Sequence, residues 1–467
     1  MTFETSSQRA GPLPCSLYTC CVNDAPSASP EPRTFRAPAG RELVVVAGVR
    51  TPFGKGGGAL RTFPASELGA LAIRELLVRG PVAAPAIEEA LFGCVGPEAT
   101  EANPARVAAL RAGLPTSVPA STVNRNCASG MEAILAAARR IALAEADVLM
   151  CGGFESMSRY PLTFGPPAVR YFEDLAKAKS LPRKLAASLR IRPSMLRPRI
   201  SLLEGLTDPI CGLNMGQTAE LLARQWNISR EEQDRFALRS HSLAAKAQHD
   251  HYFSDEVIPV YPGSGCGPLE SDESVRSGQT LEQLAKLRPY FDRTEGSVTV
   301  GNSCPVSDGA VALVVAAAER AAAEGWPILG RLAGFAVSAL DPARMGLGPV
   351  LASAKLLSQS GYTMPQIDLW EINEAFAAQV LACLRAFDDD AFARTELGWP
   401  KALGAPPLEK LNVHGGAIAI GHPVGASGAR LALTALRGLE RLGGGRAVTA
   451  LCVGGGQGVA MLWERQR

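Results

Sequence analysis

Three stretches of the sequence contain side chains that can act as nucleophiles or as acids and bases. Cys127 precedes an alanine-rich segment, His422 lies between a glycine and a proline, and Cys452 shortly precedes three glycines. Cysteine thiolates are strong nucleophiles, and histidine exchanges protons near neutral pH. Each residue alone is ambiguous, because a single cysteine or a histidine in a loop more often has a structural role.

Cys127 is expected to lie at the start of a helix. Apolar residues recur at three- and four-residue spacing from Met131 to Ala142, which predicts a helix over about 128–144. The first N–H groups of a helix have no partner within it, and the helix dipole favours negative charge there. We therefore predict that Cys127 forms a thiolate more readily than a free cysteine does.

Strands and helices alternate along most of the chain, which is typical of an α/β layer fold. A helix, an apolar strand ending in cysteine and a glycine cluster follow one another twice, at 128–153 and at 426–456. This weak repeat predicts two related α/β halves. Other predicted elements include a helix over 66–79 capped by Ser66, a helix over 86–91, a strand over 147–151 and a tight turn over 152–158.

The alternation is interrupted in the middle of the chain by a segment that we interpret as an inserted, largely helical loop domain. It is predicted to contain a helix over 230–249, preceded by the capping box of Ser229 and Glu232. Residues 159–200 carry ten basic and two acidic side chains. Such a segment forms a solvated surface or contacts an anionic phosphate tail, a partner subunit or an anionic membrane. The predicted organisation is a disordered extension (1–40), the first part of the N-terminal half (41–158), the inserted domain (159–296), the last strand of that half (297–320) and the C-terminal half (321–467).

The composition excludes several classes of protein. The chain has 467 residues, 47% of them apolar, and a net charge of +2. These values predict a large core and argue against a nucleic-acid binder. Eleven cysteines without CxxC spacing indicate neither a disulfide framework nor a zinc site, and they favour a reducing compartment such as the cytoplasm. No secretory signal is visible, and no apolar run approaches the ~18 residues of a membrane-spanning helix.

Taken in order, these stretches resemble the thiolase family of acetyl-CoA acyltransferases. The resemblance covers nearly the whole chain after residue 40. It rests on residues 50–54 (RTPFG), 126–130 (NCASG), 152–158 (GGFESMS), 215–220 (MGQTAE), 301–303 (GNS), 373–377 (NEAFA), 421–428 (GHPVGASG) and 452–456 (CVGGG). Residues 203–209 (LEGLTDP) are most similar to the thiolase subunit of fatty-acid oxidation multienzyme complexes. The resemblance implies a thiolase fold, with two pseudo-repeated halves in a five-layer α-β-α-β-α arrangement.

The resemblance also implies roles for the candidate residues. Cys127 would attack a 3-oxoacyl-CoA and hold the acyl group as a thioester, and His422 would accept the thiol proton. Cys452 would move a proton to and from the α-carbon of acetyl-CoA and then deprotonate CoA. The remaining implied site residues are Asn373, which would hold a water, Gly454, whose N–H would bind an oxyanion, and Met215 and Phe376, which would line the pantetheine tunnel.

The resemblance further implies acyl-CoA and CoA as substrates, no cofactor, and a homodimer or a dimer of dimers. The basic insertion would dock a hydratase/dehydrogenase subunit or contact a membrane peripherally. The expected activity is degradative thiolysis in fatty-acid β-oxidation. The alternatives are a biosynthetic acetoacetyl-CoA thiolase and an inactive thiolase-like scaffold. A decarboxylating ketosynthase is disfavoured, because those enzymes use a second histidine where this chain has Asn373.

Two positions depart from the family pattern. His414 replaces the asparagine of many relatives, and it would have a structural role, face solvent or perturb His422. Cys304 follows the 301–303 motif and receives no role. The family gives no precedent for a metal, so we predict no metal site.

Overall fold

The computed structural model describes residues 40–263 and 267–466. The predicted disordered extension over residues 1–40 therefore lies outside the described residues, except for Gly40. Within the described part of the chain, no helix is both long and apolar enough to cross a bilayer.

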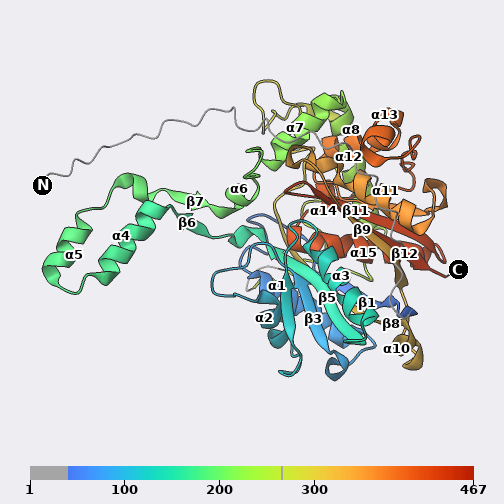
Figure 1. Ribbon diagram of the computed structural model, residues 1–467, viewed down its shortest axis with the longest axis horizontal. Coiled ribbons are helices and arrows are strands. Elements are labelled where there is room, and N and C mark those ends of the chain that lie inside the picture. Colours follow the sequence, from blue (N-terminus) through green and yellow to red (C-terminus); the bar gives the residue numbers. More distant parts are fainter. Residues whose placement is uncertain (1–39, 264–266, 467) are drawn as a thin grey trace, which may run out of the picture. The chain divides into compact units, whose positions relative to one another are not determined.

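One mixed sheet of ten strands runs through the protein (Figure 1). Its strands follow the order β10, β11, β12, β9, β1, β8, β5, β3 and β4, with β2 paired to β8. The antiparallel pairs Val44–Arg331 and Val45–Gly330 join β1 to β9 and so connect the two halves. The strands are β1 (Leu43–Arg50), β2 (Gly54–Lys55), β3 (Glu89–Gly93), β4 (Ala120–Val123), β5 (Val148–Ser156), β8 (Ser307–Ala317), β9 (Gly330–Ala339), β10 (Leu369–Ile372), β11 (Gly445–Val453) and β12 (Gln457–Arg465).

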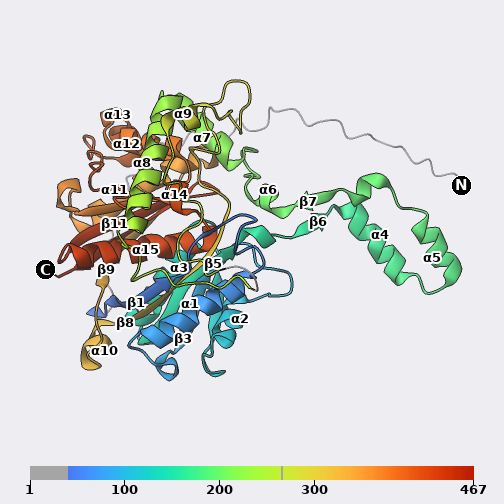
Figure 2. The same cartoon turned by 180° about the vertical axis from the view of Figure 1, so that it is seen from behind.

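Helices cover the outer faces of the sheet and fill the space between its halves (Figure 2). Because alternate strand residues point to opposite faces, Val45 packs in the central core with α3 and α15, whereas Val44 packs with α1. Likewise Leu451 faces the central core and Ala450 the outer core with α11 and α12. The layers follow the order α-β-α-β-α, so the predicted fold is confirmed. These helices are α1 (Ala65–Arg79), α2 (Pro104–Arg111), α3 (Ser129–Ala142), α10 (Ala318–Ala323), α11 (Gly348–Ser360), α12 (Ala377–Phe387), α13 (Asp390–Phe392), α14 (Ala417–Ile420) and α15 (Val424–Arg441).

The connection between β5 and β8 contains several helices, but fewer than half of its described residues are helical, so it is less helical than predicted. We name residues 159–200 the arm; in Figure 1 its two-stranded ribbon β6–β7 carries the helices α4 and α5. All residues of β6 and β7 are exposed. The domain boundaries stay a prediction. The elements of this connection are β6 (Leu162–Phe164), α4 (Pro166–Lys177), α5 (Leu181–Ser188), β7 (Pro198–Ile200), α6 (Ser201–Gly205), α7 (Met215–Gln225), α8 (Arg230–His249) and α9 (Leu281–Ala285).

The strand predicted over 147–151 continues to Ser156, so the predicted turn over 152–158 is wrong. Both glycines at its centre remain paired with β8. Their small size permits a close approach, because a Cβ on Gly153 would lie 2.0 Å from the carbonyl oxygen of Gly425. The extended strand therefore supports the loop that contains His422.

One predicted helix and one predicted helix cap are also wrong. The helix predicted over 86–91 is a short 3₁₀ turn followed by β3. Pro64, rather than Ser66, occupies the N-cap of α1, and the Ser66 hydroxyl donates to Glu101 at 2.8 Å instead. By contrast, the capping box before α8 is confirmed.

Candidate active site

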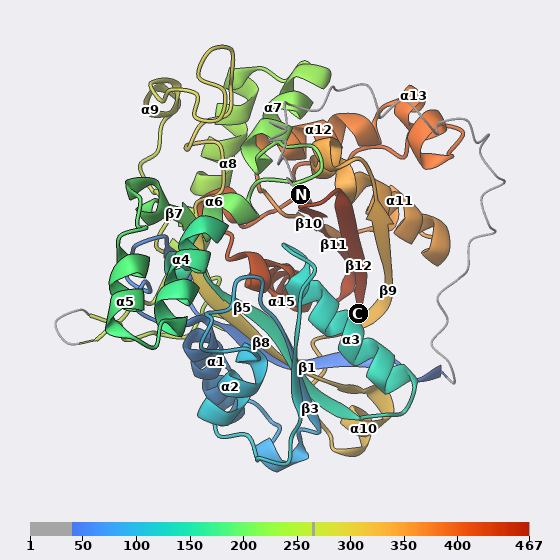
Figure 3. The same ribbon diagram turned by 60° about the vertical axis from the view of Figure 1, so that its left-hand side comes forward.

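The helices that follow Cys127 and His422 pack side by side between the two halves (Figure 3). Cys127 lies just before α3, and His422 lies just before α15. A Cβ on Gly130 would lie 2.8 Å from the backbone nitrogen of Ala429, so glycine is needed for this approach. The first turns of the two helices therefore converge.

The segment before Cys127 is tied to the turn between β11 and β12. Asn126 Nδ2 donates to the carbonyl oxygen of Gly454 at 2.8 Å, and Arg125 Nη1 donates to Gln457 Oε1 at 2.8 Å. Asn126 has a φ of 44°, a left-handed conformation that asparagine tolerates. These contacts bring the Gly454 N–H group close enough to the Cys127 thiol to favour its thiolate form.

Burial raises the pKa of the Cys127 thiol to about 11, although the Gly454 N–H and its own N–H favour the thiolate. The prediction of a readily formed thiolate at the helix start is therefore wrong. Desolvation of the charged form outweighs the two N–H donors. Cys127 consequently needs a base that accepts its proton during attack.

His422 is suited to that task because its ring is buried and oriented. Its Nδ1 lies 2.6 Å from Ser427 Oγ, and the Ser427 hydroxyl donates to the carbonyl oxygen of Pro423 at 3.0 Å. Since this hydroxyl has one proton, Oγ accepts from Nδ1–H, which leaves the lone pair on Nε2. Asn373 Nδ2 lies 3.5 Å from that Nε2.

The electrostatic surroundings keep the imidazole neutral. Burial and the positive charge of Arg430 lower the pKa of His422 to about 4. At neutral pH the ring therefore carries one proton, on Nδ1, and Nε2 is available as a base.

Cys452 lies at the end of β11 and is 2% exposed. Burial raises the pKa of its thiol above the usual range, and the neighbouring thiols of Cys127, Cys383 and Cys304 raise it further. The two predicted sulfurs are thus close enough to interact electrostatically. In its resting state Cys452 is a neutral thiol, which can donate a proton.

Asn373 continues the pairing of β10 with β11, because its N–H donates to the carbonyl oxygen of Ala450 at 2.9 Å. Its Oδ1 is buried and has no hydrogen-bond partner among the described residues. An amide oxygen in this position can accept a hydrogen bond from a water or a substrate group.

A cavity of about 320 Å³ opens onto Cys127. Met215 and Gly454 line it, and a Cβ on Gly454 would lie 3.4 Å from Met215 Sδ. His422, Asn373, Cys452 and Phe376 are not among its lining residues. Apolar residues of the segment that follows the arm also line the cavity, namely Leu202, Leu206, Pro209 and Ile210.

Comparison with known proteins decides the family. Residues 43–319 match the family model "Thiolase, N-terminal domain", and residues 326–465 match "Thiolase, C-terminal domain". The chain belongs to the thiolase family. It is therefore an acyltransferase.

Individual thiolases are similar over almost the whole chain. A "3-ketoacyl-CoA thiolase" of Yersinia pestis (strain Pestoides F) is 40% identical over 426 residues, which cover 91% of this chain and 97% of that protein. The crystal structure of the Bacillus anthracis acetyl-CoA acetyltransferase has a TM-score of 0.79 and 37% identity, covering 91% and 98% of the two chains. Human mitochondrial 3-ketoacyl-CoA thiolase in complex with CoA has a TM-score of 0.79 and 36% identity, with the same coverage.

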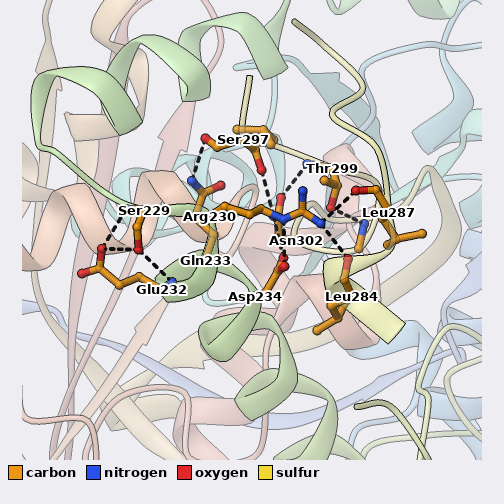
Figure 4. Close-up of polar contacts among 12 residues, drawn as sticks. Ser229, Arg230, Glu232, Gln233, Asp234, Leu284, Leu287, Ser297, Thr299 and Asn302 are labelled. Carbon is orange, nitrogen blue, oxygen red and sulfur yellow. Dashed lines mark hydrogen bonds and ion pairs between the residues drawn. The ribbon is translucent and has the colours of Figure 1, made fainter. Parts of the chain in front are cut away.

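Asn302 of the 301–303 motif is held in a polar network. This network connects the start of α8 to the 297–302 loop (Figure 4). In it, Asn302 Nδ2 donates to the buried carboxylate of Asp234 at 3.0 Å. The carbonyl oxygen of Asn302 accepts from the N–H of Ala377 at 2.9 Å. The network thus supports the segment that includes Phe376 at the start of α12.

Two unusual residues have clear positions. Cys304 lies among the site thiols, and its N–H donates to the carbonyl oxygen of Ala375 at 3.0 Å. The sequence signal for Cys304 was its position directly after the 301–303 motif. His414 stacks on Tyr252 with ring centroids 3.3 Å apart, which is a structural role. No group of three or more metal-ligating side chains occurs within the described residues.

Proposed function

We propose that this chain is a 3-oxoacyl-CoA thiolase, which cleaves 3-oxoacyl-CoA with free CoA to acetyl-CoA and a shortened acyl-CoA. The observation that carries the proposal is the setting of Cys127. Its thiol opens onto a largely apolar cavity, and the backbone N–H groups of Gly454 and of Cys127 itself favour its thiolate form. A buried, neutral His422 lies at the start of the neighbouring helix. CoA is a co-substrate, and the chain needs no resident cofactor.

The first half-reaction forms an acyl-enzyme. As the Cys127 sulfur attacks the 3-oxo carbon, its proton passes to His422 Nε2, which is why a thiol with a raised pKa can still react. The N–H groups of Cys127 and Gly454 favour negative charge at this sulfur and are suited to stabilise the negative charge that develops beside it. The bond between the α-carbon and the 3-oxo carbon then breaks, and its electrons form the acetyl-CoA enolate.

Cys452 completes this half-reaction by giving its thiol proton to the α-carbon. The raised pKa of Cys452 supports this order, because a protonated thiol is a proton donor at the start of thiolysis. His422, now protonated, and a water held by Asn373 Oδ1 stabilise the enolate oxygen.

The second half-reaction transfers the acyl group to CoA. The Cys452 thiolate accepts the proton of the CoA thiol, and the CoA sulfur attacks the thioester of Cys127. The Cys127 sulfur leaves and recovers its proton from His422, so both thiols and the imidazole return to their starting states.

The apolar lining of the cavity supports the view that the acyl chain of the substrate enters it. Met215 lies beside Gly454, where we place the pantetheine of CoA, while Phe376 packs on Phe291 and does not line the cavity. The apolar lining residues that follow the arm support substrates longer than acetoacetyl-CoA, as expected in fatty-acid β-oxidation in the cytoplasm.

The similarity to an acetyl-CoA acetyltransferase favours one alternative, a biosynthetic enzyme that condenses two acetyl-CoA molecules. The test is the thiolysis rate over a series of 3-oxoacyl-CoA lengths, with mass spectrometry of the acylated Cys127 peptide. Activity from C6 upward supports the proposal, and activity confined to acetoacetyl-CoA supports the alternative. If no acyl-enzyme forms with any substrate, the chain is an inactive scaffold.

The arm supports an assembly role in addition to catalysis. Its ten basic and two acidic residues accompany exposed apolar side chains, since Leu181, Leu185 and Leu189 are 82%, 64% and 78% exposed. This combination fits the surface of an anionic membrane. A hydratase/dehydrogenase partner subunit is the competing occupant, and the enzyme itself is expected to be a homodimer or a dimer of dimers.

A further inference from the structure

Behind His422 lies a buried ion pair that the proposed mechanism does not use. Arg430 Nη1 donates to Glu371 Oε2 at 2.9 Å, and the two side chains are 1% and 5% exposed. The other nitrogens of this guanidinium, Nε and Nη2, have no hydrogen-bond partner within the described residues. Among the described residues, Glu371 is therefore the carboxylate that pairs with Arg430.

The pair connects the same two elements that hold the imidazole. Arg430 and Ser427 are three residues apart on α15, so they share a face of that helix. Glu371 and Asn373 are two residues apart along extended chain that pairs with β11, so their side chains project to the same side.

Two cross-connections thus run in parallel from α15 to β10. One is the ion pair, and the other passes from Ser427 through His422 to Asn373. The second contains a 3.5 Å contact at the outer limit for a hydrogen bond, which cannot by itself hold the two elements at a fixed separation.

Burial makes the ion pair the stiffer connection. A charge-assisted hydrogen bond in a dry interior is stronger than a neutral one. Separating the partners would also leave the buried positive charge of Arg430 without compensation, which is strongly unfavourable. The distance between the Ser427 face of α15 and the Asn373 end of β10 is therefore set where Arg430 meets Glu371.

We propose that Arg430 and Glu371 are positioning residues, which hold α15 against β10 so that His422 keeps its Nε2 lone pair aimed at the proton of Cys127. The inference rests on the proposed function for its kinetic consequence. Its structural consequence, a fixed orientation and tautomer of His422, does not depend on which substrate is used.

The central experiment compares three variants. Glu371→Gln keeps the size and one acceptor oxygen but removes the charge, and Arg430→Met/Glu371→Met removes both charges, which avoids a single buried ion if Glu371→Gln fails to fold. Thr434→Val is the matched control, because Thr434 is 3% exposed on the same helix and hydrogen-bonds Glu256, not the His422 network.

Two measurements are made on each variant at full length. The first is single-turnover acylation of Cys127 by acyl-CoA, together with the KM for thiolysis. The second is the ¹⁵N NMR spectrum of protein labelled in its histidines. The chain has only five histidines, and His422→Gln assigns the relevant signals.

We expect Arg430→Met/Glu371→Met to acylate on the order of ten- to a hundredfold more slowly, the range for a misplaced catalytic group, with KM within twofold of the wild type. The His422 signals should change from one Nδ1–H tautomer to a broadened mixture, while Thr434→Val changes neither measurement. A double variant with wild-type acylation and His422 signals would overturn the proposal, as would equal losses in Thr434→Val. If the wild type forms no acyl-enzyme, the proposed function fails, and the NMR comparison alone decides the positioning role.

Discussion

The starts of α3 and α15 occupy corresponding places in the two halves, but their surroundings differ. At α3, Cys127 is partly exposed and lines the cavity, beside the exposed side chain of Asn126. At α15, His422 is 5% exposed, and both of its ring nitrogens have a polar neighbour. A nucleophile has to admit its substrate, whereas a base has to keep one tautomer and one orientation. The repeat therefore places Cys127 and His422 at equivalent positions, and their different surroundings suit one to be the nucleophile and the other to be the base.

The largest effects on activity should come from replacing the two thiols, and the two replacements should block different steps. Cys127→Ala removes the nucleophile, so neither acyl-enzyme nor thiolysis should be detectable. Cys452→Ala should still become acylated but release product more slowly by a factor of about 10²–10⁴, the usual contribution of a general acid–base group. Mass spectrometry of the Cys127 peptide after mixing with acyl-CoA measures both.

Cys211→Ala is the control, since Cys211 is partly exposed and does not line the cavity. It should acylate and turn over like the wild type. Equal loss of acylation in Cys127→Ala and Cys452→Ala would contradict the separate roles of the two sulfurs.

A smaller effect on turnover should follow from changing the surroundings of the buried His422 alone. Ser427→Ala removes the acceptor for Nδ1–H, so that His422 can adopt the unproductive tautomer. We expect kcat to fall on the order of tenfold, with little change in KM, because the cavity is untouched. Ser353→Ala is matched, because Ser353 is also buried and its hydroxyl has no hydrogen-bond partner among the described residues. A similar decrease in both variants would reduce Ser427 to a packing residue.

The third prediction concerns stability in acid. Burial lowers the pKa of His241, His414 and His422 to about 4. A depressed pKa in the folded state contributes stability that is present above the unfolded value of 6.5 and is lost as pH falls towards 4. Glu371 acts in the opposite direction, because burial raises its pKa to about 7, so its contribution is lost as pH rises from 4.5 to 7.

His414→Phe tests this linkage without touching the site, because phenylalanine can still stack on Tyr252. Its free energy of unfolding, from urea titrations, should fall less than that of the wild type between pH 6.5 and 4. The difference should be at most about 3 kcal/mol, since one pKa unit corresponds to about 1.4 kcal/mol and the ring is only partly buried. Val78→Ala, at a residue that is 76% exposed and does not titrate, should run parallel to the wild-type curve. Parallel curves for all three proteins would contradict a desolvated His414.

The site motifs could be predicted from the sequence because each combines a reactive side chain with glycines in a fixed order. Burial could not, since it depends on elements far apart in the chain. The Cys127 thiol illustrates this, because local helix geometry favours the thiolate while tertiary desolvation reverses the balance. Gly153 is another case: its sequence indicates a turn, but its function is to let the Gly425 backbone approach a continuous strand.

The ion pair of Arg430 with Glu371 could not be predicted from the sequence either. Neither residue stands out in the sequence, because a charged residue on a helix or next to a strand is usually solvated. Their importance appears only once α15 is packed against β10. The fold and the nucleophile can thus be recognised from local sequence motifs, whereas the groups that orient the base can be recognised only from the packed structure.

The smallest effect on turnover should come from changes in the arm, because the proposed mechanism uses none of its residues. Replacing Arg190, Arg192, Arg197 and Arg199 with glutamine should leave thiolysis of a short substrate unchanged. Binding to phosphatidylserine vesicles in a co-sedimentation assay should weaken about a hundredfold or more, since each basic residue near an anionic surface contributes about 1 kcal/mol. Glutamine at Arg61, Lys286, Arg288 and Arg293, which are exposed outside the arm, should have little effect. If vesicle binding is unchanged but co-purification with a hydratase/dehydrogenase subunit is lost, the arm binds a protein rather than a membrane.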